Sequence, residues 1–128
     1  MVFSLRNCGR VGMGEEFDTI DESALERLRK LGGDALLSKM VDLFISHAEP
    51  AIEEASAGVK SGDIEVVQRA AHSLKSSAGN LGAQRVQRLA ERIEQSAEDR
   101  NTAELNELMT SLKHAYSEAK AQLCAEIA

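Results

Sequence analysis

The most informative segment of this sequence is Ala71-His72-Ser73-Leu74-Lys75-Ser76-Ser77-Ala78-Gly79-Asn80-Leu81-Gly82. Apolar residues in and just before it recur at the spacing of one helix face: Ile64, Val67, Ala71, Leu74, Ala78 and Leu81. His72 follows a residue of this stripe by one position. At about 100° per residue, its ring therefore points away from the core and toward water.

The helical neighbours of His72 give this face its chemistry. Gln68 lies four residues before it, and Lys75, Ser76 and Gly79 lie three, four and seven residues after it. Two of these neighbours are small and one is a cation. An exposed imidazole with a lysine beside it and space around it suits the exchange of an anionic group with a large partner.

The run from His72 to Gly82 resembles the motif of histidine-containing phosphotransfer (HPt) domains. That motif is histidine, any residue, an aliphatic residue, lysine, glycine and two small residues, and then an aliphatic residue followed by glycine. Its spacing is kept here without a gap over the eleven residues from His72 to Gly82. The chain departs from the motif at Ser76, where the family usually has glycine. The similarity extends from about Ile20 to Ala125 in the order and length of the helical segments. The resemblance implies a phosphoryl carrier that works between receiver domains.

The rest of the chain reads as helices joined by short turns, with no alternating strand pattern. A short helix after Asp21 ends at Gly32-Gly33, and Pro50 predicts a kink or a break in the next helix. Four long amphipathic segments follow that short helix: from Asp34 to about Val59, from Asp63 to about Gly82, around Val86–Ala97, and from Asn101 onward. The sequence predicts an all-α fold, an antiparallel up-down four-helix bundle with a short extra N-terminal helix.

The 128 residues are enough for one domain with one core. We expect a flexible leader over residues 1–19, in which Met13 is a candidate natural start, and an HPt-like domain over residues 20–128. No apolar run approaches the ~18 residues of a membrane span, and the N-terminus does not read as a secretory signal. Cys8 and Cys124 show no metal-type or disulfide pattern, which favours free thiols and a cytoplasmic location.

Charge is unevenly distributed along the sequence. The chain carries a net charge of −6, which argues against nucleic acid as a partner. The segment from Arg69 to Arg92 nevertheless has five basic residues and one acidic residue. Its arginines are candidates for docking an acidic partner surface, with the last three forming a stripe beside the face of His72: Arg69, Arg85, Arg88 and Arg92. Solvated basic helix faces are the alternative interpretation.

The chemistry available to the chain centres on His72. No phosphate-binding loop of an ATP-dependent kinase and no metal-ligand spacing occurs, so we expect no cofactor bound by this chain. His72 is the candidate phosphoryl acceptor, Lys75, Ser76 and Gln68 are candidates for stabilising the phosphoryl group, and Gly79 keeps the flank small. We expect Mg²⁺ and the second phosphoryl-bearing group, an aspartate, on a response-regulator receiver domain, with a hybrid sensor histidine kinase as a further partner.

Two alternatives remain open at this stage. The chain could be an adaptor that docks receiver domains without phosphoryl transfer. It could also be a dimeric phosphotransfer bundle, although four long helices can close a core within one chain, which favours a monomer.

Overall fold

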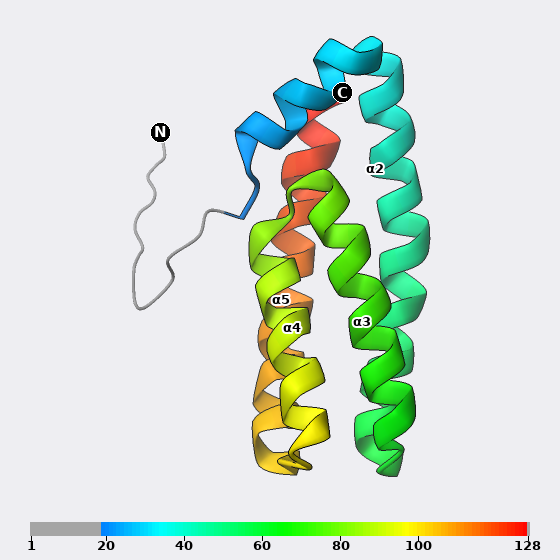
Figure 1. Ribbon diagram of the computed structural model, residues 1–128, viewed down its shortest axis with the longest axis vertical. Coiled ribbons are helices and arrows are strands. Elements are labelled where there is room, and N and C mark those ends of the chain that lie inside the picture. Colours follow the sequence, from blue (N-terminus) through cyan, green and yellow to red (C-terminus); the bar gives the residue numbers. More distant parts are fainter. Residues whose placement is uncertain (1–18, 128) are drawn as a thin grey trace.

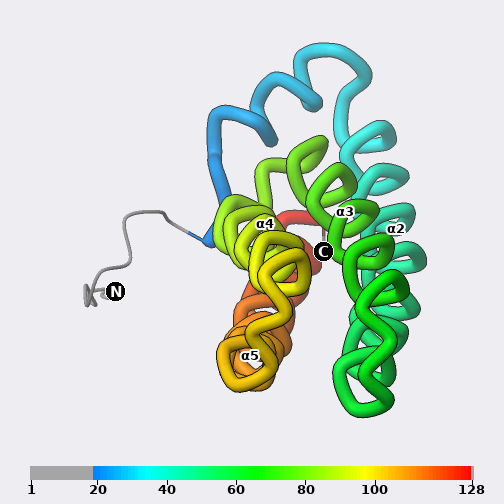
Figure 2. Tube along the Cα trace, turned by 60° about the horizontal axis from the view of Figure 1, so that its bottom comes forward, coloured from blue at the N-terminus to red at the C-terminus, as the bar shows by residue number. Residues whose placement is uncertain are grey.

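The computed structural model describes residues 19–127 as a bundle of helices without strands (Figure 1). The helices are α2 (Glu22–Ser61), α3 (Ile64–Leu81), α4 (Gln84–Glu98) and α5 (Thr102–Glu126). Each packs against its two neighbours in a ring: α2 on α3, α3 on α4, α4 on α5 and α5 on α2. Figure 2 shows this arrangement from a direction closer to the bundle axis. The predicted antiparallel four-helix bundle is confirmed.

Two glycines divide α2 into the short N-terminal helix and the first long helix of the bundle. Gly32 (φ −150°, ψ 15°) and Gly33 (φ 71°, ψ −165°) leave the helical region, and the second of them adopts a positive φ that favours glycine. The short helix therefore turns and runs across the end of the bundle (Figure 1). Arg29 fastens it there, because its guanidinium lies 3.3 Å from a carboxylate oxygen of Asp34 and 2.7 Å from one of Glu126, at the end of α5.

Side-chain caps begin three of the described helices where the sequence predicts them. Asp21 accepts a hydrogen bond from the backbone N–H of Ser23, and Asp63 accepts one from Val66. Asn101 accepts one from Glu104, but the carboxylate of Glu104 does not complete a capping box. It accepts a hydrogen bond from the hydroxyl of Ser96 instead, which ties the start of α5 to the end of α4.

Pro50 does not break α2. The only non-helical backbone angles inside this helix are those of Gly32 and Gly33, so the break that we considered at Pro50 does not occur. Pro50 lies on the exposed side of the helix. Proline has no N–H to donate to the backbone carbonyl of Ser46, and at this exposed position water can donate that hydrogen bond instead.

The core is aliphatic. Its largest fully buried side chains come from every described helix: Leu25, Leu37, Val41, Val67, Leu74, Leu81, Val86, Ile93, Leu105, Leu112 and Leu123. Phe44 of α2 and Tyr116 of α5 add an aromatic pair with ring centroids 5.8 Å apart. Burying one such aliphatic side chain stabilises the fold by about 1.5–3 kcal/mol. This core holds α3 in one orientation and so determines which of its residues face water.

The described residues also refine the predicted N-terminal boundary. Thr19, which we assigned to the leader, is buried at 7% exposure and precedes the buried Ile20, so the packed domain begins by Thr19. The remainder of the predicted leader, residues 1–18, lies outside the described residues. Between residues 19 and 127, no helix combines the length and the apolar character needed to cross a membrane.

Gly82 is expected to be the most sensitive of the turn glycines. It ends α3 at φ 78°, and a Cβ at this position would lie 2.7 Å from the Cβ of Ala24 in the short helix. Gly82→Ala should therefore lower the free energy of unfolding by about 2–4 kcal/mol, through backbone strain and overpacking together. Gly62→Ala is the matched control, because Gly62 has the same φ of 78° and no atom within 4 Å of an added Cβ. Denaturant unfolding of both variants measures the difference, and equal losses would contradict the packing argument.

Candidate functional site

His72 lies on the exposed side of α3, as the periodicity predicts. Val67, Ala71, Leu74 and Ala78 turn the opposite side of this helix into the core, with exposures of 0–2%. The side chain of His72 is 64% exposed. The ring is thus carried on a rigid helix and remains accessible to a partner.

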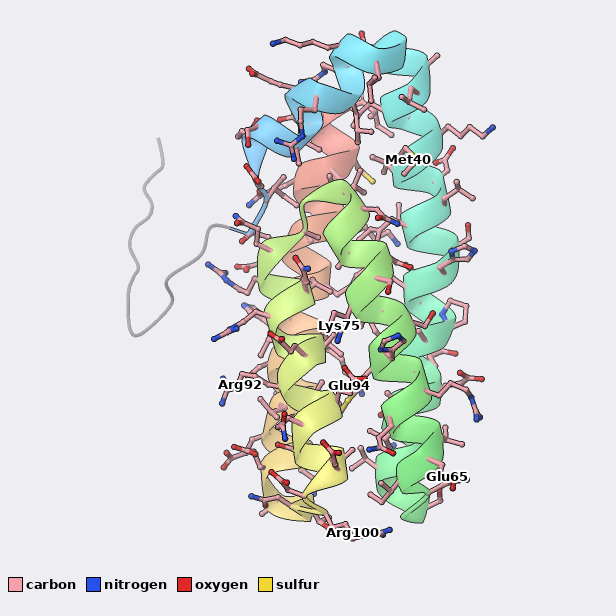
Figure 3. The ribbon with its side chains drawn as sticks, viewed as in Figure 1. Met40, Glu65, Lys75, Arg92, Glu94 and Arg100 are labelled. Atoms are coloured by element: carbon pink, nitrogen blue, oxygen red, sulfur yellow. The ribbon has the colours of Figure 1, made fainter. Side chains whose placement is uncertain are left out.

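Glu94 of α4 links His72 to Lys75. One carboxylate oxygen of Glu94 lies 3.0 Å from Nδ1 of His72, and the other lies 2.9 Å from Nζ of Lys75. Figure 3 shows Lys75 and Glu94 pointing toward each other between α3 and α4. The imidazole and the ammonium are therefore held one helical turn apart by a single carboxylate.

The protonation of this cluster follows from its contacts. Burial opposes ionisation of Glu94, but the hydrogen bonds from Lys75 and His72 outweigh it and lower the pKa of its carboxyl below the usual value. The hydrogen bond to Glu94 raises the pKa of Lys75. An ionised carboxylate can only accept hydrogen bonds, so Nδ1 of His72 carries a proton and donates a hydrogen bond to Glu94. In the neutral ring, Nε2 is left with a free electron pair.

Glu94 is not among the site residues that the sequence pattern predicted. A usable signal was present, because the turn at Gly82 makes α3 and α4 antiparallel neighbours, and residues at similar distances from it then lie side by side. His72 lies ten residues before Gly82, and Glu94 lies twelve residues after it. Glu94 also follows the buried Ile93 by one position, which places it at the edge of the core face.

The other predicted neighbours of His72 occupy different environments. Ser76 is exposed and Gln68 is half-buried, and neither hydrogen-bonds the imidazole within the described part of the chain. Gly79 is also exposed, but a Cβ there would lie 2.9 Å from the side-chain nitrogen of Gln87 in α4. Its missing side chain therefore leaves room for the end of the Gln87 side chain, in addition to any role in keeping the flank of His72 open.

The predicted basic stripe does not flank His72 along its length. The expected position beside His72 is wrong for Arg85, whose guanidinium lies 3.0 Å from Glu118 of α5 on the other side of α4. Figure 3 shows Arg92 at the outer edge of α4, pointing away from α3. Arg88 lies 3.1 Å from Glu91, while Arg69 is exposed on α3. The charged group in direct contact with His72 is thus Glu94, which also binds Lys75, and the sequence segment that ends at Arg92 omits it.

The two other histidines are exposed and lie in different surroundings. His47 is on α2, and His114 on α5 has a side chain that is 80% exposed and lies 3.7 Å from Glu118. Among residues 19–127, no three His, Cys, Asp or Glu side chains gather in a way that could hold a metal ion. Cys124 is a free, exposed thiol, and Cys8 is outside the described residues.

Comparison with known proteins identifies the family. The model of the Hpt domain family matches residues 39–122. The sensor protein TorS of Escherichia coli is 35% identical over 77 residues, which make up 60% of this chain and 8% of that sensor. This chain therefore corresponds to only a small part of TorS.

Two solved structures share the fold. Histidine-containing phosphotransfer protein B of Pseudomonas aeruginosa has a TM-score of 0.79 at 20% identity, over 85% of this chain and 94% of that one. A rice protein described as a histidine-containing phosphotransfer protein has a TM-score of 0.72 at 21% identity, over 86% of each chain. Since the family match spans well over half of the sequence and includes His72, the chain belongs to the Hpt domain family, the histidine-containing phosphotransfer domains.

Proposed function

We propose that this protein accepts a phosphoryl group on Nε2 of His72 from the aspartate of one receiver domain and passes it to the aspartate of another. The observation that carries the proposal is the contact between Nδ1 and Glu94 on a side chain that is 64% exposed. This contact fixes the tautomer in which the accessible nitrogen, Nε2, is the nucleophile.

The transfer step requires little of the chain beyond position and charge. The electron pair of Nε2 forms the N–P bond while the P–O bond to the donor aspartate breaks, and the aspartate leaves as a carboxylate. The ring becomes positively charged because Nδ1 keeps its proton. The hydrogen bond to Glu94 is then charge-assisted at both ends and strengthens as the bond forms.

Lys75 supplies the cation beside the incoming group. Its ammonium is already held 2.9 Å from Glu94, one turn from the ring, so little conformational freedom is lost when it also approaches a phosphoryl oxygen. Ser76 and Gln68 remain candidates for further hydrogen bonds to that group. Reversal of the same step returns the phosphoryl group to a second receiver.

The partners and the setting belong to this proposal. We propose response-regulator receiver domains and a hybrid sensor histidine kinase as partners, with Mg²⁺ held by the receiver domain. We further propose that the chain is cytoplasmic and that it works as a monomer. The monomer is supported by the buried aliphatic side chains, which form one core cluster that includes all four described helices. Docking of receiver domains without transfer is the second candidate function, and the exposed face of α3 would serve it equally well.

A phosphoryl-transfer assay tests the proposal directly. The protein is incubated with a panel of receiver domains phosphorylated with labelled phosphate, and label on its chain is followed over seconds to minutes. We expect rapid labelling by at least one receiver and a label that is lost in acid but retained in alkali, as a phosphoramidate is. Tight receiver binding without any label would favour the adaptor instead.

Ser76 tests whether the partner approaches over this face of α3. Ser76→Leu should block transfer without unfolding the bundle, because Ser76 is exposed one turn from His72. Ser76→Gly should leave transfer intact and lower the free energy of unfolding by about 0.5–1 kcal/mol, the usual effect of glycine in a helix. Ser111→Leu, an exposed serine on α5, serves as the matched control. Full transfer by the Ser76→Leu protein would show that the partner docks elsewhere.

A further inference from the structure

A hollow of about 220 Å³ lies between α3 and α4, next to the proposed phosphoryl acceptor. It is lined by Lys75, Gln84, Gln87, Arg88 and Glu91. The volume is many times the ~10–15 Å³ that one water molecule requires. Lys75 is shared between this hollow and the contact with Glu94, so the two features adjoin.

The hollow falls within the footprint that a docked receiver domain would occupy. A typical interface buries about 800 Å² on each partner, which corresponds to a patch of roughly 16 Å radius. Lys75 is about 4.5 Å along the helix from His72, and Gly79, over which Gln87 lies, is about 10 Å along it. A patch centred on His72 therefore covers the hollow. Since interface cores pack as densely as protein interiors, a partner group is expected to enter it.

The lining selects the chemistry of that group. All five lining residues carry hydrogen-bonding groups, and an apolar side chain would leave these groups desolvated and unsatisfied. Lys75 and Arg88 are cations, and Gln84 and Gln87 carry amide N–H groups. The one acidic residue, Glu91, is outnumbered by the two cations, which disfavours a basic occupant.

We propose that this hollow receives one acidic side chain of the docked receiver domain, an aspartate or a glutamate. This inference rests on the proposed function. The carboxylate of that side chain would lie between the ammonium of Lys75 and the guanidinium of Arg88. The contact between Arg88 and Glu91 does not prevent this, because both side chains are more than half exposed and their pairing is screened by water. The hollow then serves as a second anchor beside His72 and helps to determine which receivers bind.

Arg88 and Arg92 provide a matched pair for the test. Both are exposed arginines of α4, and only Arg88 lines the hollow. The probe is the unphosphorylated form of the receiver domain that labels the wild-type protein fastest, and its dissociation constant is measured by titration calorimetry. We expect Arg88→Gln to weaken binding about tenfold, the effect of losing a charge-assisted hydrogen bond in an excluded site. Arg92→Gln should weaken it less than about threefold, as an exposed charge does.

The outcomes separate this inference from the proposed function. Equal losses of receiver affinity for the two variants would mean that only the overall positive charge of this surface attracts the receiver. No loss of affinity for Arg88→Gln would mean that the hollow holds water alone. Either result overturns the inference. Should no receiver label the chain, the panel member that binds tightest becomes the probe. The proposed function would then fail, while the comparison of Arg88 with Arg92 would still decide whether the hollow anchors a receiver. Thermal unfolding of both variants confirms that the fold is intact.

Discussion

Replacing His72 with glutamine is expected to reduce labelling by a phosphorylated receiver to background. The amide nitrogen of glutamine has no available electron pair, so no N–P bond can form, whereas its N–H can still donate to Glu94. The side chain of His72 is 64% exposed, so the free energy of unfolding should change by no more than about 0.5 kcal/mol. Transfer kinetics and thermal unfolding on the same preparation test both statements.

The controls are the two other histidines. His47→Gln and His114→Gln should retain full labelling, because neither ring has a hydrogen-bonded carboxylate among the described residues: the contact of His114 with Glu118, at 3.7 Å, is beyond hydrogen-bond distance. Unchanged labelling of the His72→Gln protein would refute the assignment. Loss of label in either control would transfer the role to that histidine.

Replacing Glu94 with alanine is expected to slow transfer by about one to two decades at saturating receiver. The hydrogen bond from Nδ1 is charge-assisted in the transition state, and bonds of this kind contribute about 1.5–3 kcal/mol. Glu94→Gln keeps an acceptor oxygen but removes the charge, so its rate should lie between those of the alanine variant and the wild type. Receiver affinity should change little for either variant.

A measurement of the ring itself separates positioning from general damage. Nitrogen chemical shifts of His72 should show the proton on Nδ1 in the wild type and a mixture of tautomers in Glu94→Ala. A slowed rate with an unchanged tautomer would mean that Glu94 acts through charge alone. A normal rate in the alanine variant would remove Glu94 from the mechanism.

Lys75→Ala completes the comparison. If Lys75 acts on the chemistry, the variant should slow transfer at saturating receiver by about one to two decades, beyond any loss of affinity that comes from its place in the hollow. If it acts only in docking, receiver affinity should fall and the saturated rate should be normal. The ring proton of His72 should stay on Nδ1 in this variant, because Glu94 still faces the ring. Single-turnover kinetics and an equilibrium titration distinguish the two roles.

The sequence by itself determined the helices, their order and the exposed position of His72. These properties are local, because a helix repeats every 3.6 residues and its ends are marked by nearby caps such as Asp63 and Gly82. The same periodicity places Lys75 one turn from His72. The motif that runs from His72 to Gly82 was also sufficient to suggest the Hpt domain family, which the comparison with known proteins confirmed.

Only the tertiary structure decided which charges meet at the site. Summing charges between Arg69 and Arg92 predicts a basic face, but the packing of α4 turns Arg85 toward Glu118 of α5 and brings Glu94 against His72. Neighbours in sequence lie about 100° apart around a helix, so a charge block is divided among several faces when the helix packs. The carboxylate that sets the tautomer of His72 lies 22 residues away from it, and only the antiparallel pairing of α3 and α4 brings the two together.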